Sequence, residues 1–583
     1  MGCMVRRTDK RRTLHDRLER ARIRLARPDA LLQLALLGIL TGLAAGLVIV
    51  AFRYLVEGLQ AAFLPGGNAE NYEGLGWQWR LLLPVLGGAL LAALFRWWGK
   101  GIQVLGVARV MERMAYHQGY LTLREFVLQF VGAAVAIASG HSVGREGPHV
   151  HLGAASGSLL GQWLTLPNNS IRTLAGCGIA AGISASFNTP LAGVVFALEV
   201  VMLEYSVASF VPVILSAAIA ALVSHAAFGG GAAFEVPAMS LAALSDVLVV
   251  VMLGLMAGAV AAGFNFLLQQ TAATGRRLAI WWRLMLAGVL GGAIGTLVPE
   301  VMGIGYDSLD LVLAGEVALA TLGLLVTAKL LATTIAVGLG VPGGMIGPSL
   351  FIGACLGGIA GWLGEALGVS SGTGFFALLG MGAMMGASLQ APLAALTAMM
   401  ELTSSPGIIM PGMLAVIIAS LTASELFGKE SLFVTMLRSA GMDYEASPVL
   451  QALRRVGVAS VMSTRFARID TRVTAERARA TLAEEPTWLL VGDGEAPAFL
   501  LRAVDLASQL DTQPESAEID LGEIPGRRYN VAPVNLQATL QEGLDILRDH
   551  SAEALYVQRM TAPGIHRVYG ILTREMVDSA YRY

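Results

Sequence analysis

Two short turns with the pattern Gly-x-x-Gly-Pro are the parts of this chain best suited to bind an ion. One runs from Gly144 to Pro148 and the other from Gly344 to Pro348, each ahead of an apolar stretch rich in small residues. Glycine lets a backbone approach a ligand closely, and proline is tolerated in a first helical turn because its missing N–H would be unpaired there. A helix N-terminus offers unpaired N–H donors and about half a positive charge. Two such ends that converge predict a site for a small anion.

The two turns differ at their central positions. Arg145 and Glu146 in the first turn stand where Met345 and Ile346 stand in the second. An acid at a helix start within a membrane is costly and marks a functional residue. Glu146 is therefore the predicted gate, because its carboxylate can fill the anion site when ionised and leave it when protonated or displaced. The alternative is a salt bridge between Arg145 and Glu146 or a neighbour. The predicted anion-binding residues of the two turns are Gly144, Arg145, Gly147, Pro148, Gly344, Met345, Ile346 and Gly347.

Three histidines flank the first turn, and a metal site must be weighed for them. They are His141, His149 and His151. The chain has no His-Glu-x-x-His motif, and histidines two positions apart do not share a helix face. A packing or solvent-facing role is favoured over metal binding. We predict no catalytic residue and no metal site, so an enzyme is not expected.

The composition places these turns in a membrane protein. Of 583 residues, 55% are hydrophobic and only 14% are charged, whereas a soluble protein carries about 25% charged residues. Many apolar runs approach the ~20 residues that cross a bilayer, and shorter ones predict broken or re-entrant helices. Cys177 and Cys355 fall in apolar stretches and predict packing rather than a disulfide. The main runs are Ala30–Val56, Trp79–Trp98, Phe126–Ser139, Val211–Ala227, Val247–Leu267, Leu284–Leu297, Ala320–Val337 and Met413–Phe427.

Basic residues predict the orientation. They are concentrated in residues 1–29, in the loop that includes Arg96 and Arg113, around Arg276, and in the tail after Phe427. Such clusters favour the cytoplasmic side. Both termini are therefore expected in the cytoplasm, with an even number of crossings between them in a plasma or bacterial inner membrane.

An internal repeat links the two turns. At an offset of 200 residues the first turn falls on the second, and at an offset of 202 residues Ser186–Glu199 falls on Ser388–Glu401. The match includes Pro-Leu-Ala and the closing glutamate. Paired repeats are typical of transporters whose substrate site lies between the halves near the middle of the membrane. We place the halves at about residues 30–230 and 240–430.

These segments resemble the CLC family of chloride channels and proton/chloride antiporters. The resemblance rests on Gly144–Pro148, Phe187–Glu199, Gly340–Pro348 and Gly303–Tyr306, and it covers residues 30–430. It implies an all-α polytopic fold of inverted repeats. It also implies a homodimer with one pore per subunit, chloride as substrate, and Glu146 as the external gating glutamate.

Three departures from the family pattern bear on function. Lys100, in Gly99–Gln103, stands where the family has an anion-coordinating serine, and it either lines the pore or faces cytoplasmic water. Pro406 stands where the family has a coordinating tyrosine. Val200 follows Glu199 where proton-coupled members carry a second, internal glutamate. We therefore expect uncoupled, channel-like anion conduction gated by Glu146, with a proton-coupled antiporter as the alternative. A magnesium transporter would need more intramembrane acids than the chain offers.

The tail has a different composition. Residues 431–455 are expected to be a linker and residues 456–583 resemble tandem CBS domains of α/β type, with an acidic connection at Asp511–Glu523. CBS domains bind adenosine nucleotides through a hydroxyl residue followed by an aspartate. Here Met576 replaces the aspartate after Thr573, and Arg502 replaces the hydroxyl residue before Asp505. No cofactor is predicted, and dimer stabilisation is the alternative to nucleotide binding.

Overall fold

The computed structural model describes residues 25–26, 30–102, 105–203, 207–229, 241, 243, 245–369, 371–403, 405–442, 448–494, 496–513, 518–562 and 565–580. The basic N-terminal segment lies outside these residues except for Leu25 and Ala26, and so do Gln103 and Ser404. The chain divides into two compact units. One contains residues 34–163 and 172–445, and the other contains residues 1–33, 164–171 and 446–583.

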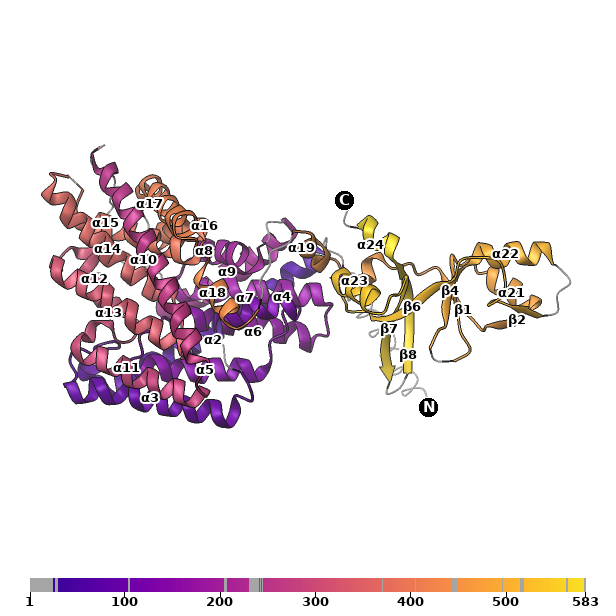
Figure 1. Ribbon diagram of the computed structural model, residues 1–583, viewed down its shortest axis with the longest axis horizontal. Coiled ribbons are helices and arrows are strands. Elements are labelled where there is room, and N and C mark those ends of the chain that lie inside the picture. Colours follow the sequence, from indigo (N-terminus) through magenta and orange to yellow (C-terminus); the bar gives the residue numbers. More distant parts are fainter. Residues whose placement is uncertain are drawn as a thin grey trace. The chain divides into compact units, whose positions relative to one another are not determined.

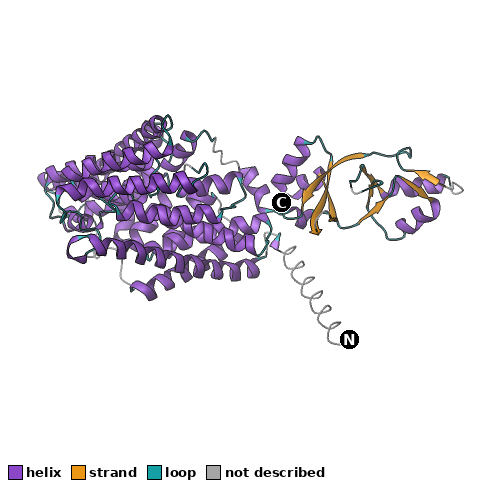
Figure 2. Ribbon diagram, turned by 90° about the horizontal axis from the view of Figure 1, so that it is seen from below, coloured by secondary structure: helices purple, strands orange, loops and turns teal. Residues whose placement is uncertain are grey.

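The larger unit is built from helices, which Figures 1 and 2 show packed side by side. Its α-helices are α2 (Leu31–Phe63), α3 (Trp77–Trp98), α4 (Val107–Tyr116), α5 (Leu123–Ala138), α6 (Glu146–Trp163), α7 (Asn168–Phe187), α8 (Pro190–Phe196), α9 (Val207–Phe228), α10 (Asp246–Gly275), α11 (Ile280–Leu297), α12 (Tyr306–Ala314), α13 (Leu319–Gly338), α14 (Ile346–Ala366), α15 (Thr373–Leu389), α16 (Pro392–Thr403), α17 (Ile409–Leu421) and α18 (Leu432–Ser439). Short turns of 3₁₀ or π type are η1 (Pro65–Gly67), η2 (Ala197–Met202), η3 (Pro299–Val301), η4 (Pro406–Ile408) and η5 (Thr422–Leu426).

The helix lengths agree with a polytopic membrane fold. Within the described residues, 8 helices are long and apolar enough to cross a bilayer. The α14 helix is the most enclosed of them, with 83% of its most apolar window buried, whereas only 33% is buried in α3. Helices α8 and α16 are too short to span. The short apolar runs Leu284–Leu297 and Met413–Phe427, in contrast, overlap elements long enough to span, Ile280–Leu297 and Pro406–Leu426. Large apolar side chains on the outside of α2 and α3, such as Leu36 and Leu90, suit a lipid surface.

The smaller unit contains mixed α/β structure that repeats one order of elements. It includes α19 (Pro448–Arg455), α20 (Val458–Val461), β1 (Phe466–Ile469), β2 (Arg472–Thr474), α21 (Ala475–Leu482), β3 (Trp488–Val491), β4 (Phe499–Arg502), α22 (Ala503–Thr512), β5 (Glu518–Asp520), β6 (Tyr529–Asn535), α23 (Leu540–Asp549), β7 (Ala554–Ala562), β8 (Ile565–Thr573) and α24 (Arg574–Ala580). The main sheet has the order β1-β3-β4-β6-β7-β8. In each half a parallel pair with a helix between its strands is followed by an antiparallel strand. This arrangement is consistent with the expected pair of CBS-like units.

Two details of the tail differ from the sequence interpretation. The expected acidic connection at Asp511–Glu523 is partly structured, because α22 extends to Thr512 and Glu518–Asp520 forms β5. Strand β5 pairs antiparallel with β2, and Ile519 buries its side chain, so a short apolar anchor in the acidic stretch explains the strand. The segment expected as a linker, residues 431–455, contains helices α18 and α19.

Candidate functional site

The two Gly-x-x-Gly-Pro turns meet in space, as their repeat-related positions predicted. The N–H of Gly144 donates to the carbonyl of Gly344 at 2.8 Å, and the N–H of Gly344 donates to the carbonyl of Gly144 at 2.7 Å. This antiparallel bridge leaves no room for larger residues nearby. A Cβ atom on Gly147 would lie 2.7 Å from the Cα of Gly344, and one on Gly344 would lie 2.6 Å from the nitrogen of Gly147. Glycine at both positions is therefore a packing requirement.

The bridge brings together the starts of two helices. Helix α6 begins at Glu146 and helix α14 at Ile346. The fully buried side chain of Glu146 reaches across, and its Oε2 accepts a hydrogen bond from the N–H of Gly347 at 3.1 Å. A helix N-terminus with unpaired N–H groups is a natural anion site, and here a carboxylate fills it. The gate residue that we predicted thus occupies the start of the opposite repeat's helix.

Tyr306 supplies the second hydrogen bond to the Glu146 carboxylate. Its hydroxyl donates to Oε1 of Glu146 at 2.5 Å. The guanidinium of Arg145 lies 5.2 Å from the centre of the Tyr306 ring and forms an ion pair with Glu57, with Nη1 and Oε1 3.7 Å apart. The salt-bridge alternative therefore takes the form of an Arg145–Glu57 pair, while Glu146 is held by neutral donors. The sequence identified Gly303–Tyr306 only as a signature segment, and it did not predict the hydrogen bond from Tyr306 to Glu146.

A buried lysine fixes the loop that carries Tyr306. The Nζ of Lys329 donates to the carbonyls of Val301, Gly303 and Ile304 at 3.1, 3.1 and 2.9 Å. Lys329 is fully buried on α13, so these three carbonyls take the place of water around its charge. The sequence signal, a lone lysine in an apolar run, was present but was not used.

Glu70 holds the start of α12 from the loop before α3. Its Oε2 accepts a hydrogen bond from the backbone N–H of Tyr306 at 2.9 Å. Partial loss of solvent raises the pKa of the Glu70 carboxyl, although this hydrogen bond and the charge of Arg145 oppose the shift. An acid at a helix start complements the helix dipole. Glu70 and Lys329 thus position the tyrosine from two sides.

The second pair of repeated segments also meets. The Glu199 carboxylate accepts hydrogen bonds from the N–H groups of Leu393 and Ala394 at the start of α16, at 3.1 and 2.6 Å. Glu401 does the same at the start of α8, with the N–H groups of Leu191 and Ala192 at 3.0 and 2.7 Å. The glutamate at the end of each matched segment therefore caps the start of the helix in the other matched segment. These two acids have a structural explanation as reciprocal caps.

The remaining predicted site residues fall into two groups. Pro148, Met345 and Ile346 are buried in the first turns of the two helices. Lys100 is exposed with a positive φ of 41°, and Pro406 is exposed at the start of η4. Neither side chain is brought into contact with the Glu146 carboxylate by a described hydrogen bond or ion pair.

The three histidines are all buried, so the solvent-facing alternative is wrong for them. His141 Nδ1 lies 3.0 Å from Ser139 Oγ, and His151 Nδ1 lies 3.3 Å from the carbonyl of Gly106. His149 packs edge-on against Phe52 with ring centres 5.3 Å apart. Packing is the role that these contacts support.

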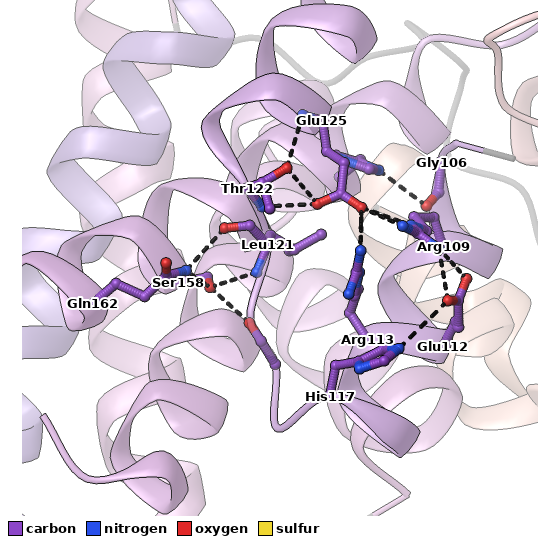
Figure 3. Close-up of polar contacts among 12 residues, drawn as sticks. Gly106, Arg109, Glu112, Arg113, His117, Leu121, Thr122, Glu125, Ser158 and Gln162 are labelled. Atoms are coloured by element: carbon purple, nitrogen blue, oxygen red, sulfur yellow. Dashed lines mark hydrogen bonds and ion pairs between the residues drawn. The ribbon is translucent and has the colours of Figure 1, made fainter. Parts of the chain in front are cut away.

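A cavity of about 260 Å³ leads to the paired turns. Its lining includes Gly147, Gly344 and Met345, together with residues of α4, α18 and the α10–α11 connection. Arg109 and Glu112 form an ion pair with Nη1 and Oε1 2.6 Å apart (Figure 3). Both residues line the cavity. Residues of both paired turns therefore border a cavity that has space for a small solute.

Comparisons with known sequences agree with this geometry. The family described as "Voltage gated chloride channel" matches residues 87–424. A protein of Ralstonia nicotianae named "Putative chloride channel protein ClcB-like" is 35% identical over 400 residues, which cover 67% of this chain and 93% of that protein. The "H(+)/Cl(-) exchange transporter ClcA" of Yersinia pestis is 30% identical over 433 residues, which cover 71% of this chain and 89% of that protein.

Solved structures show the same fold. A slow cyanobacterial Cl−/H+ antiporter matches 70% of this chain and 97% of its own, with a TM-score of 0.62 and 22% identity. A eukaryotic CLC transporter matches 94% of this chain and 98% of its own, with a TM-score of 0.61 and 19% identity. The second match extends over the C-terminal α/β region as well as the helices.

Proposed function

The chain belongs to the CLC family of chloride channels and transporters, and from this premise we propose that it exchanges chloride for protons across the membrane. Membership makes it a multi-pass integral membrane protein that transports anions, and not an enzyme. The exchange mode, the gate and the ligands of the anion are the parts that we propose.

The observation that carries the proposal is the position of the Glu146 carboxylate. It accepts a hydrogen bond from the N–H of Gly347 at the start of α14, where an anion would bind. The same carboxylate can also bind a proton. An anion and the ionised carboxylate compete for that N–H, so an anion binds best when Glu146 is protonated or displaced. A group that must alternate between holding a proton and yielding to an anion supports coupling of the two fluxes.

The relatives support exchange over simple conduction. Several proteins of 28–30% identity are named H(+)/Cl(-) exchange transporters. The channel-like interpretation, which the sequence favoured, rests on Val200 in place of an internal acid, and Val200 is buried beside the capped Glu199. It also has the support of the relative named as a putative chloride channel. Exchange is our main proposal, and uncoupled conduction is the second candidate.

Several features of the assembly remain proposals alongside the mechanism. We propose a homodimer, cytoplasmic termini, and anion contacts from the backbone of Gly144–Pro148 and Gly344–Gly347. A role of Lys100 in attracting anions and a dimer-stabilising role of the CBS-like units belong to the same proposal.

The test is simultaneous recording of chloride and proton movement in proteoliposomes. Exchange predicts uphill proton movement driven by a chloride gradient, in a fixed ratio to chloride flux. Glu146→Gln should abolish proton movement and leave pH-independent chloride flux, whereas Glu365→Gln, at an exposed position near the end of α14, should change neither. Chloride flux without proton movement in the unmodified protein would establish the channel instead.

A further inference from the structure

The cavity at the paired turns is lined by two arginines that form no ion pair with a described carboxylate. Arg276 is the C-cap residue directly after α10, Arg283 lies in the first turn of α11, and both line the cavity. Arg276 is exposed, whereas Arg283 is only 6% exposed. Neither forms an ion pair with a carboxylate among the described residues. The guanidinium of Arg283 experiences the like charge of Arg276.

In the third arginine of the cavity, Arg109, the charge is neutralised by carboxylates. Arg109 pairs with Glu112 at 2.6 Å and with Glu125 at 2.5 Å, and Arg113 adds a further contact to Glu125 at 2.9 Å (Figure 3). Glu112 is the one acid among the cavity's described lining residues, and both of its oxygens accept hydrogen bonds from Arg109. Among the described lining residues, therefore, no carboxylate is left to neutralise the charges of Arg276 and Arg283.

Arg283 is held in a way that leaves its outer nitrogens available. Its Nε donates to the carbonyl of Leu339 at 3.1 Å, directly before the loop that runs into the second turn. Its Nη groups donate to no described residue. Keeping a buried guanidinium without an anion costs free energy, and guanidinium groups bind oxyanions with paired N–H donors. The arrangement is that of an anion receptor on a fixed support.

The chemistry points to a multivalent oxyanion rather than to the transported ion. Transport sites must release their ion, and two uncompensated arginines would hold a permeant anion for too long. A cavity of about 260 Å³ has space for an anion much larger than chloride. We propose that Arg276 and Arg283 form a binding site for a phosphate-class oxyanion, and that its occupancy blocks the approach to Gly344 and Met345. The binding part stands apart from the proposed exchange function, and the blocking part rests on it.

Binding is tested with the full-length protein in detergent by isothermal titration with inorganic phosphate, pyrophosphate and ATP. Replacing Arg283 or Arg276 with glutamine should weaken binding about tenfold or more, because each variant loses charge-assisted hydrogen bonds. Arg283→Lys should bind with intermediate affinity, since charge is kept and the fork is lost. Arg277→Gln is the matched control, because it removes a neighbouring exposed arginine that does not line the cavity.

Blocking is tested by chloride flux from proteoliposomes with the same oxyanions on either side at equal ionic strength. Inhibition from one side, weakened in Arg283→Gln but not in Arg277→Gln, is the expected result. A preference for inorganic phosphate or for ATP identifies the free ion or the ester as the source. Equal affinity of Arg283→Gln and the unmodified protein, or an equal loss in Arg277→Gln, would overturn the site. Absence of chloride flux with phosphate binding intact would instead overturn the proposed transport function.

Discussion

Replacing Tyr306 with phenylalanine should move the activation of chloride flux to higher pH. The Tyr306 hydroxyl donates to the buried Glu146 carboxylate at 2.5 Å, and a donor of this kind favours the ionised form, which is the closed form of the gate that we propose. A hydrogen bond to a charged group contributes about 1.5–3 kcal/mol, and 1.36 kcal/mol corresponds to about one pH unit. Since the N–H of Gly347 remains as a donor, we expect the midpoint of the flux–pH curve to rise by about 1 to 2 units.

The assay is initial chloride efflux from proteoliposomes, measured over a series of pH values and normalised to the maximum. The charged groups around the gate are the same in both proteins, because Arg145 and Lys329 are unchanged. Tyr72→Phe is the matched control. It removes a fully buried hydroxyl that donates to the carbonyl of Ile137 at 2.8 Å and has no described contact with Glu146.

An unchanged midpoint in Tyr306→Phe, with normal protein folding, would show that this hydrogen bond does not stabilise the ionised gate. A midpoint displaced to lower pH would show that the tyrosine favours the protonated form, which is the opposite of the reasoning above. A shift of equal size in Tyr72→Phe would attribute the effect to general loosening of the surrounding loops.

Two further predictions concern the supports of the site. Lys329→Met removes a positive charge near the proposed gate and the donor to three loop carbonyls. The midpoint of the flux–pH curve should therefore rise again, and thermal stability should fall. Lys329→Arg keeps the charge and should bring the midpoint most of the way back to its unmodified value in the same efflux assay. Glu401→Gln leaves one of the two N–H groups at the start of α8 without an acceptor and the other with a neutral one. This change should lower stability by about 1–3 kcal/mol in thermal melts while the pH midpoint stays unchanged. Unequal behaviour of Glu199→Gln and Glu401→Gln would contradict their reciprocal roles.

The sequence carried the information that the two turns meet, because repetition reveals a relation between distant segments. Aligning the repeats placed Gly144 against Gly344, and these residues form the bridge in the structure. The same alignment paired Glu199 with Glu401, yet their reciprocal caps were not predicted. A repeat shows that two residues are equivalent, but not that each contacts the other's repeat.

The contacts of Tyr306 were beyond reach for a different reason. Its partners lie far away in the chain: Glu70 precedes it by 236 positions and Glu146 by 160. Neither distance relates to a helical period or to the repeat offset. A structural role for Lys329 could have been predicted, because a lysine in an apolar helix must be paired or solvated. The three carbonyls that accept its hydrogen bonds could not have been named from the sequence.

In the exchange mechanism that we propose, the departure from symmetry at Glu146 is what couples the two fluxes. If the second turn also carried an acid in place of Ile346, both helix starts would face carboxylates, and an anion would meet repulsion from both sides. If the first turn lacked its acid, the N–H of Gly347 would be open to anions at every pH. With one acid, proton binding and anion binding are linked through a single hydrogen-bond donor. Reciprocity then requires that whatever protonation adds to anion affinity, the anion adds to proton affinity. In the proposed mechanism, the carboxylate that closes the path therefore also makes each bound anion favour the uptake of a proton.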